Sequence, residues 1–243
     1  MADRTSIVIS DVHLGEVPPD TERAFVSFLE SLAGTAHELL INGDLFDFWF
    51  EYHNVVPRRC FRVLRRLSEL VDAGVRVRLV VGNHDAWVGS FLADEIGIEL
   101  LDGPVEIAIA TRRAYVAHGD GLLGRDLGYR ILKRATRSAA FRALFRLVPP
   151  DLFFPLARRV SGTPARRRAG PEHDRERADR LSAHARALLA RRPELDLVIF
   201  GHAHRPELLE VQPGRYYLNA GDWIHHRSFG VLSDNAIELR HWS

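Results

Sequence analysis

The sequence has little sulfur and no long apolar run. Cys60 is the only cysteine among 243 residues, so no internal disulfide can form, and this is consistent with a reducing compartment. No uninterrupted apolar segment reaches the length of a membrane-spanning helix. Residues 1–6 lead directly into an apolar run without the hydrophobic region of a signal peptide. We therefore expect a soluble, cytoplasmic protein.

A linker is also missing. With 46% hydrophobic residues, a chain of this length can bury one large α/β core, and no segment divides it into two independent halves. We expect one domain over residues 1–243 that carries an insertion.

Five short motifs end apolar runs with residues that can bind metals. They are Asp11-Val12-His13, Gly43-Asp44, Gly82-Asn83-His84-Asp85, His118-Gly119-Asp120 and Gly201-His202-Ala203-His204. The β-rich runs before them cover residues 7–9, 39–41, 79–81, 115–117 and 197–200. One such motif alone is typical of an ordinary loop. All five together predict a site, because ligands of open α/β sheets gather outside the carboxyl ends of the strands.

The residue types indicate the chemistry. Asp, Asn and His supply oxygen and neutral imidazole nitrogen, a mixture that suits divalent Mn, Fe or Zn. Two such cations about 3.5–4 Å apart can activate water and polarise a phosphoryl oxygen, so the set predicts metal-assisted hydrolysis. We expect Asp44 to bridge the cations, because Gly43 lets the backbone approach closely at a strand end.

The order of the motifs resembles the calcineurin-like metallophosphoesterase superfamily from Asp11 to His204. The resemblance implies an α/β fold, a four-layer α/β/β/α sandwich with a helical cap insertion. It implies one metal held by Asp11, His13, Asp44 and His204. It implies a second metal held by Asp44, Asn83, His118 and His202.

The same resemblance gives His84 and Asp85 catalytic roles. His84 would lie beside the scissile phosphate and stabilise charge or protonate the leaving oxygen, with Asp85 orienting its ring. A His beside a carboxylate fits acid–base work near neutral pH. The alternative is that His84 only supports the metal ligands.

A long insertion separates the fourth and fifth motifs. His118 and His202 are 84 residues apart, whereas earlier anchors are 33, 39 and 35 residues apart. Apolar residues at three- and four-residue steps predict a helix over 127–148 that Pro149-Pro150 ends. A second helix is expected to begin after an Asp151 cap and to end at 161–164, and a third to cover 172–190. We expect the helical cap to span 122–170.

The cap is strongly basic and carries apolar side chains. Residues 125–168 contain twelve basic and two acidic residues, a charge of +10, while the rest of the chain carries −9. Such a concentration predicts an anionic partner. The apolar side chains are Phe141, Leu144, Phe145, Phe153 and Phe154. They either pack on the main domain or form an acyl-chain groove or a membrane-facing cap.

Together these features narrow the resemblance. The segments 43–49 (GDLFDFW) and 118–122 (HGDGL), with the Arg-rich insertion, resemble the UDP-2,3-diacylglucosamine diphosphatase family of lipid A biosynthesis. This implies hydrolysis to UMP and 2,3-diacylglucosamine 1-phosphate with Mn, at the cytoplasmic face of the inner membrane. The implied substrate contacts are Asn83, His84, Asp126, Ser161, Arg166 and His202. The best-known branch carries Arg where this chain has His84, which indicates a related branch.

Other functions stay open. A phosphodiesterase or nuclease of the same superfamily would also use the motifs, and an arginine stripe suits a nucleic-acid backbone. Phe and Leu interleave the arginines here, so we expect a nucleotide-linked glycolipid and no nucleic acid. A non-enzymatic scaffold would have lost metal ligands, and none is missing. His225 and His226, after 219–223, lie in a loop that either borders the metals or has no role in the site.

Overall fold

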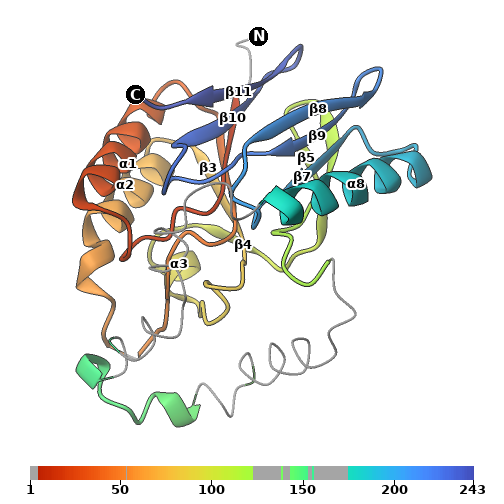
Figure 1. Cartoon of the computed structure of the whole chain (residues 1–243). Coiled ribbons are helices and arrows are strands. Elements are labelled where there is room, and N and C mark those ends of the chain that lie inside the picture. The colour runs from red at the N-terminus through yellow and green to blue at the C-terminus, as the bar shows by residue number, and fades with distance from the viewer. Residues whose placement is uncertain (1–4, 53, 123–137, 139–142, 153–154, 156–174) are drawn as a thin grey trace.

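The computed structural model describes residues 5–52, 54–122, 138, 143–152, 155 and 175–243 (Figure 1). Its helices are α1 (Pro19–Leu32), η1 (Arg58–Cys60), α2 (Phe61–Asp72), α3 (Phe91–Asp94) and α8 (Arg175–Arg191). Its strands are β1 (Ser6–Ile9), β2 (Glu38–Asn42), β3 (Arg76–Val80), β4 (Glu99–Leu101), β5 (Val105–Ile109), β6 (Arg112–Val116), β7 (Leu197–Phe200), β8 (Glu207–Gln212), β9 (Arg215–Asn219), β10 (Ser228–Leu232) and β11 (Ile237–His241).

The strands form two mixed sheets. One has the order β11-β10-β1-β2-β3-β4 and the other β5-β6-β7-β9-β8. The five predicted apolar runs are confirmed as β1, β2, β3, β6 and β7. Within the first sheet β1, β2 and β3 are parallel, and in the second β6 is parallel to β7. The motifs that follow these strands therefore leave each sheet at one edge.

Three apolar clusters divide the molecule into four layers. In β1, Ile7 and Ile9 face the cluster that includes α1 and α2, while Val8 belongs to the cluster between the sheets. In β7, Ile199 faces the other sheet and Val198 packs with α8. Figure 1 shows α1 and α2 outside one sheet and α8 outside the other. This alternation confirms the α/β/β/α sandwich.

The described part of the insertion differs from its predicted helices in two details. Helical residues end at Phe145 rather than at Val148, and the chain then forms a turn. Pro149 accounts for this, because a proline disfavours helical backbone at the residue before it. Helix resumes at Pro150. Asp151 therefore lies inside this second helical segment and does not cap it. Proline at a first helical position needs no N–H donor.

The remaining predictions for the insertion are met or lie outside the structure's range. The third predicted helix, 172–190, is confirmed as α8 over its described part, Arg175–Arg191. Most of the segment 122–170, including Phe141, Phe153 and Phe154, lies outside the described residues. Within the described ranges, no helix is both long and apolar enough to cross a membrane.

Candidate metal centre

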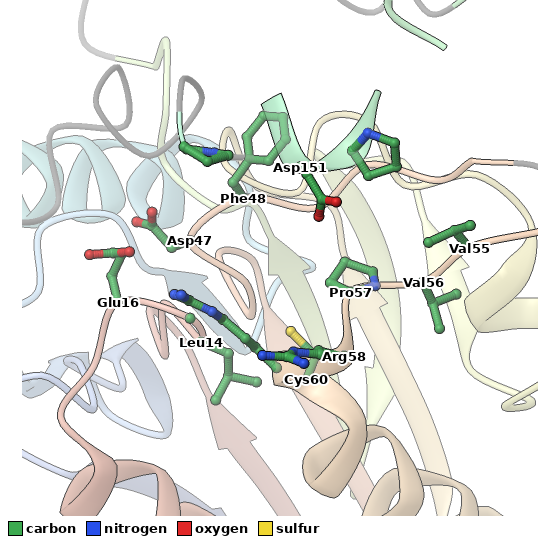
Figure 2. A pocket seen from close by; sticks show the side chains of 14 residues that line it. Leu14, Glu16, Asp47, Phe48, Val55, Val56, Pro57, Arg58, Cys60 and Asp151 are labelled. Carbon is green, nitrogen blue, oxygen red and sulfur yellow. The ribbon is translucent and has the colours of Figure 1, made fainter. Parts of the chain in front are cut away.

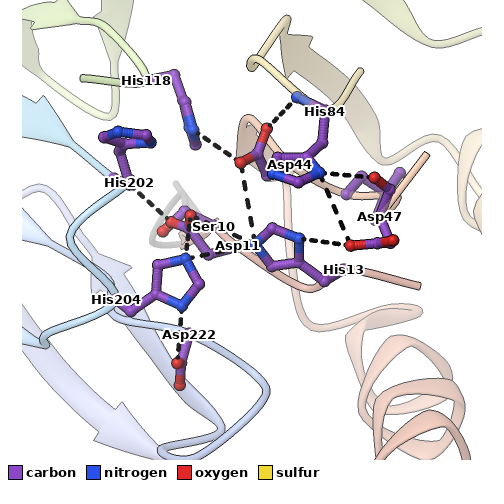
Figure 3. Close-up of polar contacts among 12 residues, drawn as sticks. Ser10, Asp11, His13, Asp44, Asp47, His84, His118, His202, His204 and Asp222 are labelled. Atoms are coloured by element: carbon purple, nitrogen blue, oxygen red, sulfur yellow. Dashed lines mark hydrogen bonds and ion pairs between the residues drawn. The ribbon is translucent and has the colours of Figure 1, made fainter. Parts of the chain in front are cut away.

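The five motifs meet at one place between the two sheets. Asp11 and His13 follow β1, Asp44 follows β2, His118 follows β6, and His202 with His204 follows β7. Figure 3 shows their side chains pointing toward a common centre. Three groups have potential ligand atoms that all lie within 4.8 Å of one another: Asp11, His13 and His204; His13, Asp44 and His84; and Asp44, His118 and His202. These are His/Asp clusters typical of two-metal phosphoesterases.

Asp44 lies between these groups. Its Oδ2 is 3.1 Å from His118 Nε2 and 3.9 Å from His13 Nε2. Glycines make the approach possible: a Cβ at Gly82 would lie 2.2 Å from Asp44 Oδ1, and one at Gly43 would lie 2.3 Å from His118 Nδ1. Only residues without a Cβ fit there, which agrees with the close backbone approach expected at Gly43.

The backbone at the centre is locally strained. The φ angles are positive at Asp11 (54°), His13 (52°), Asp44 (54°), His202 (65°) and His204 (57°). Left-handed backbone is uncommon for residues other than glycine, and its cost persists only where the surrounding structure enforces it. Parallel β1 and β2 enforce it here through hydrogen bonds from Asp11 N to Gly43 O and from His13 N to Asp44 O. The strained turns aim the side chains inward.

Oxygen atoms behind the rings hold two histidines, and a carboxylate oxygen lies behind a third. His118 Nδ1 lies 2.9 Å from Asn42 O, and His204 Nδ1 lies 3.1 Å from Asp222 Oδ2. His13 Nδ1 lies 3.6 Å from Asp47 Oδ1. Each ring therefore turns its Nε2 toward the centre. Histidines that bind metals in proteins are held by this kind of contact.

The buried charges at the centre depend on one another. Burial would raise the pKa of Asp44, but the neighbouring His118 and His84 hold it well below the usual value. Burial would lower the pKa of His118, yet the carboxylates of Asp44 and Asp11 raise it to about 10. At His202, burial and the charge of His118 lower the pKa to about 3, so this ring is neutral.

The donor atoms fit divalent metal ions. Several predicted ligands contribute buried side-chain atoms that have no hydrogen-bond partner among the described residues, among them Asp11 Oδ1, Asp44 Oδ2, Asn83 Oδ1, His118 Nε2 and His202 Nδ1. A buried polar atom without a partner is costly, and buried charges are normally paired or bound to metals. Two carboxylate oxygens, one amide oxygen and two imidazole nitrogens form the mixed set that suits transition metals.

His84 has a different partner from the one predicted. Its backbone N–H donates to Asp44 Oδ1 (2.9 Å), and its Nδ1 lies 2.6 Å from Asp47 O. The Asp85 carboxylate instead accepts the backbone N–H groups of Leu45 and Phe46. Asp85 is fully buried, and its two oxygens bond the loop after β2. Asp47 therefore orients His84, and the expected role of Asp85 in that contact is corrected.

Two carboxylates near the centre were not predicted from the sequence. Some predicted residues are not tested by the structure. Asp47 lies three residues after Asp44 in the segment 43–49, and Asp222 lies in the loop that drew attention for its two histidines. For both, the available signal in the sequence was a position shortly after a predicted strand. The predicted substrate contacts Asp126, Ser161 and Arg166 lie outside the described residues. His84 and His202 are at the centre, and Asn83 stands next to His84 in the chain with a buried Oδ1.

A groove opens beside the centre. It has a volume of about 490 Å³ and includes Leu14, Glu16 and Asp47 from the loops near the metal ligands. Figure 2 shows Glu16 and Asp47 at one end and Val55 and Val56 at the other. Arg58, Arg59, Pro150, Asp151 and Pro155 also line the groove. The described part of the insertion therefore forms one of its walls.

The insertion is attached to the loops around this groove. Tyr52 donates its hydroxyl to Val148 O (2.7 Å), and Arg146 Nε donates to Glu51 O (3.3 Å). The Phe145 ring lies 5.8 Å from the Trp87 ring. Phe145 thus packs on the main domain, as one of the two predicted arrangements requires.

Fold and site together define a class of protein. Residues 5–206 match the calcineurin-like phosphoesterase family, which covers most of the chain. The chain therefore belongs to this family, and it is a metal-dependent phosphoester hydrolase.

Relatives match nearly the whole chain. A protein of Porphyromonas gingivalis named UDP-2,3-diacylglucosamine hydrolase is 30% identical over 95% of this chain and 94% of its own length. A protein of Aeromonas salmonicida with the same name is 33% identical over 97% of this chain and 92% of its own length. Among solved structures, the Escherichia coli phosphoesterase Yfce covers 98% of this chain and 93% of its own, with 16% identity and a TM-score of 0.47.

Proposed function

We propose that this protein hydrolyses the pyrophosphate of UDP-2,3-diacylglucosamine to UMP and 2,3-diacylglucosamine 1-phosphate. The observation that carries the proposal is the position of the solvent-exposed apolar side chains. In the described ranges, the exposed large hydrophobic residues are Val55, Val56, Phe61, Leu144, Leu147 and Leu152. Val55 and Val56 line the groove beside the metal centre, and Leu152 is next to Asp151, which also lines it. A substrate with acyl chains next to a scissile phosphate would use such a surface.

The relatives support the same substrate. The proteins from P. gingivalis and A. salmonicida match this chain over most of both lengths, so the phosphoesterase core and the insertion are both covered. His84 in place of Arg marks the branch of the family to which we assign the chain.

In this proposal two divalent ions, which we take to be Mn²⁺ rather than Fe or Zn, complete the centre. One would be held by Asp11, His13, Asp44 and His204, and the other by Asp44, Asn83, His118 and His202. When bound, they supply an activated water and polarise the phosphoryl oxygen. The role of the protein is to place that pair between two sheets and to turn the imidazole rings toward it.

His84 is the catalytic side chain of the proposal. Its ring is held by Asp47 O and lies 4.7 Å from the His13 ring, at the open side of the centre. From there it would bind the scissile phosphate and stabilise charge on the leaving UMP oxygen. Asp85 acts behind it by holding the loop that carries Asp44, so we keep it as a supporting residue.

The insertion would place the enzyme at its substrate. We treat residues 1–243 as one domain with a helical cap over 122–170, in which Asp126, Ser161 and Arg166 contact the substrate. The charge of +10 over 125–168 supports binding at the cytoplasmic face of an anionic inner membrane. The apolar walls of the groove favour a glycolipid over a nucleic acid.

Turnover with identified products tests the function. Metal-free protein is reconstituted with Mn²⁺ and given UDP-2,3-diacylglucosamine, bis-p-nitrophenyl phosphate, a cyclic nucleotide and a single-stranded oligonucleotide. We expect UMP and the acylated sugar phosphate by mass spectrometry, at a kcat/KM far above those of the other substrates. Faster cleavage of the oligonucleotide or the cyclic nucleotide would favour the phosphodiesterase or nuclease alternative.

A further inference from the structure

The loop between β9 and β10 crosses from one sheet to the other directly behind the metal centre. β9 belongs to the five-stranded sheet and β10 to the six-stranded sheet. Within this loop, Trp223 N donates to Asp11 O (3.2 Å), and Asp222 Oδ2 lies 3.1 Å from His204 Nδ1. Asp11 follows β1 and His204 follows β7. The crossover therefore contacts one candidate metal ligand from each sheet.

Asp222 is buried, and its two carboxylate oxygens have different partners. Oδ1 accepts three N–H groups at 3.0 Å each: the backbone N–H of His225, the backbone N–H of His226, and the Nδ1–H of His226. Oδ2 faces His204 (Figure 3). The side chain is inaccessible to solvent. Three donors on one oxygen fix the direction of the carboxylate and leave the other oxygen aimed at the His204 ring.

The loop itself is anchored. Trp223 is fully buried, and its ring lies 4.8 Å from the ring of Phe25 and 4.9 Å from that of Phe28, both in α1. Ser228 Oγ donates to Ala220 O (2.6 Å) and closes the base of the loop. Asp222 is thus held from both sides before any metal is present.

We propose that Asp222 is a positioning residue for one of the two metal sites, and that His226 and the backbone of His225 hold Asp222 in place. An ionised carboxylate only accepts hydrogen bonds, so it keeps the proton of a neutral His204 ring on Nδ1 and leaves Nε2 to bind the metal. His204 Nε2 lies 3.2 Å from Asp11 Oδ1, on the side of the site formed with His13. His225 and His226 thus have a function in holding Asp222, and this function does not require them to contact the substrate.

The inference rests on the two-metal centre of the proposed function, and one substitution separates the two. In Asp222→Asn the three donors at Oδ1 would select the amide oxygen, so the amide NH₂ group would face His204. His204 would then have to accept at Nδ1 and carry its proton on Nε2. We expect a 10–100-fold loss of affinity at the site with Asp11 and His13, the range for losing such a contact. The site with Asp44 and His118 should keep its affinity.

The experiment is a titration of metal-free protein with Mn²⁺, in which electron paramagnetic resonance measures the free ion. Wild type should bind two ions, and Asp222→Asn should bind one with unchanged affinity and one more weakly. Asp234→Asn is the matched control, because Asp234 is exposed in the β10–β11 turn. Its two affinities should equal those of wild type. The melting temperatures of the metal-free proteins are compared in parallel.

Each outcome has a clear meaning. Fewer than two ions bound by wild type would contradict the two-metal centre of the proposed function. Two ions in wild type and unchanged binding in Asp222→Asn would overturn the inference alone. Equal weakening at both sites would also overturn it, since this indicates a general structural role. If Asp222→Asn does not fold, His226→Ala removes one of the three donors and should weaken the same site severalfold, and unchanged affinity there would overturn the inference.

Discussion

At the scale of single residues, Asp44 is the side chain on which both metal sites depend. It lies between His118 and His13, at 3.1 and 3.9 Å. We expect Asp44→Asn to abolish turnover and to lower the content of both metals, because an amide cannot donate negative charge to two cations. Asp72→Asn, at the exposed end of α2, is the control. Metal analysis of both purified variants decides this, and full occupancy in Asp44→Asn would remove Asp44 from the bridge.

His84 should act on the reaction without holding the metals. We expect His84→Ala to slow hydrolysis by roughly 10²–10⁴-fold, the range for one positioned acid–base group, with metal content unchanged. UMP is a good leaving group that needs little protonation. If charge stabilisation dominates, His84→Arg should therefore retain more activity than His84→Gln. Steady-state rates of the three variants give the comparison, and equal rates would contradict that role.

Metal binding should release protons. In the metal-free protein, neighbouring carboxylates overcome burial and raise the pKa of His118 to about 10 and that of His204 to about 9. Both rings are therefore protonated at pH 7 and must become neutral to bind a metal. We expect about two protons to leave, and affinity to rise with pH until both rings titrate. Calorimetry in buffers of different ionisation enthalpy measures the number, and an enthalpy independent of the buffer would contradict it.

The ligands could be read from the sequence because each motif follows a short apolar run near the end of a strand. Their supporting residues could not. Asp85 stands next to His84, yet adjacent residues at a strand end point in different directions, and its oxygens turn to the backbone of Leu45 and Phe46. The contact with Asp47 O depends on the path of the loop after β2, which spacing does not encode.

At the scale of elements, a buried ion pair within one sheet also contacts the other sheet. Arg78 of β3 pairs with Glu38 of β2 and donates to Ala108 O of β5 (3.2 Å), and the two side chains are only 2% and 6% exposed. We expect Arg78→Met to lower the free energy of unfolding by about 3–5 kcal/mol, because it leaves the buried Glu38 carboxylate without its cationic partner. Adding Glu38→Met should recover most of that loss. Urea denaturation measures both variants.

Arg76 offers the matched control on the same strand. It pairs with Glu99 at the surface, where both side chains are about half exposed. Arg76→Met should therefore cost less than about 1 kcal/mol, as is usual for exposed pairs. Similar losses for Arg76→Met and Arg78→Met would show that the buried pair has no special role in joining the sheets.

The elements also show where sequence patterns are informative. β1, β2, β3, β6 and β7 were predictable because each contains a short apolar run that is largely buried, and such runs identify strands of a covered sheet. The ends of the helices in the insertion were less predictable from the sequence. Pro149 correctly indicated that a helix ends here. The helix ends earlier than predicted, at Phe145, because the residues just before the proline form a turn instead of a last helical turn.

At the scale of the whole molecule, the groove should determine the choice of substrate. Val55 and Val56 line it and are 47% and 38% exposed, so their replacement leaves the core intact. We expect the double variant Val55→Ser/Val56→Ser to raise KM for the diacylated substrate about 15-fold, since losing contact with two CH₂ groups costs about 1.6 kcal/mol. A small soluble diester should be unaffected.

The control for the groove is Phe61→Ser, which removes a 64% exposed ring outside the groove lining. Both variants are assayed at a fixed detergent concentration. A parallel loss of activity toward both substrates would place the valines in the folding core, and an equal effect of Phe61→Ser would indicate general contact with lipid.

The strand order has a consequence for biosynthesis. β1 pairs with β10, so Ser6 meets Leu232, and the crossover loop that contacts Asp11 precedes β10. At about 5–20 residues per second, a ribosome needs roughly 10–45 s to reach β10 after completing β1. During that interval β1 has β2 on one side and an open edge on the other. The nascent chain therefore lacks the contacts of the crossover loop with Asp11 and His204 until translation approaches β10, although all the candidate metal ligands have been made by then.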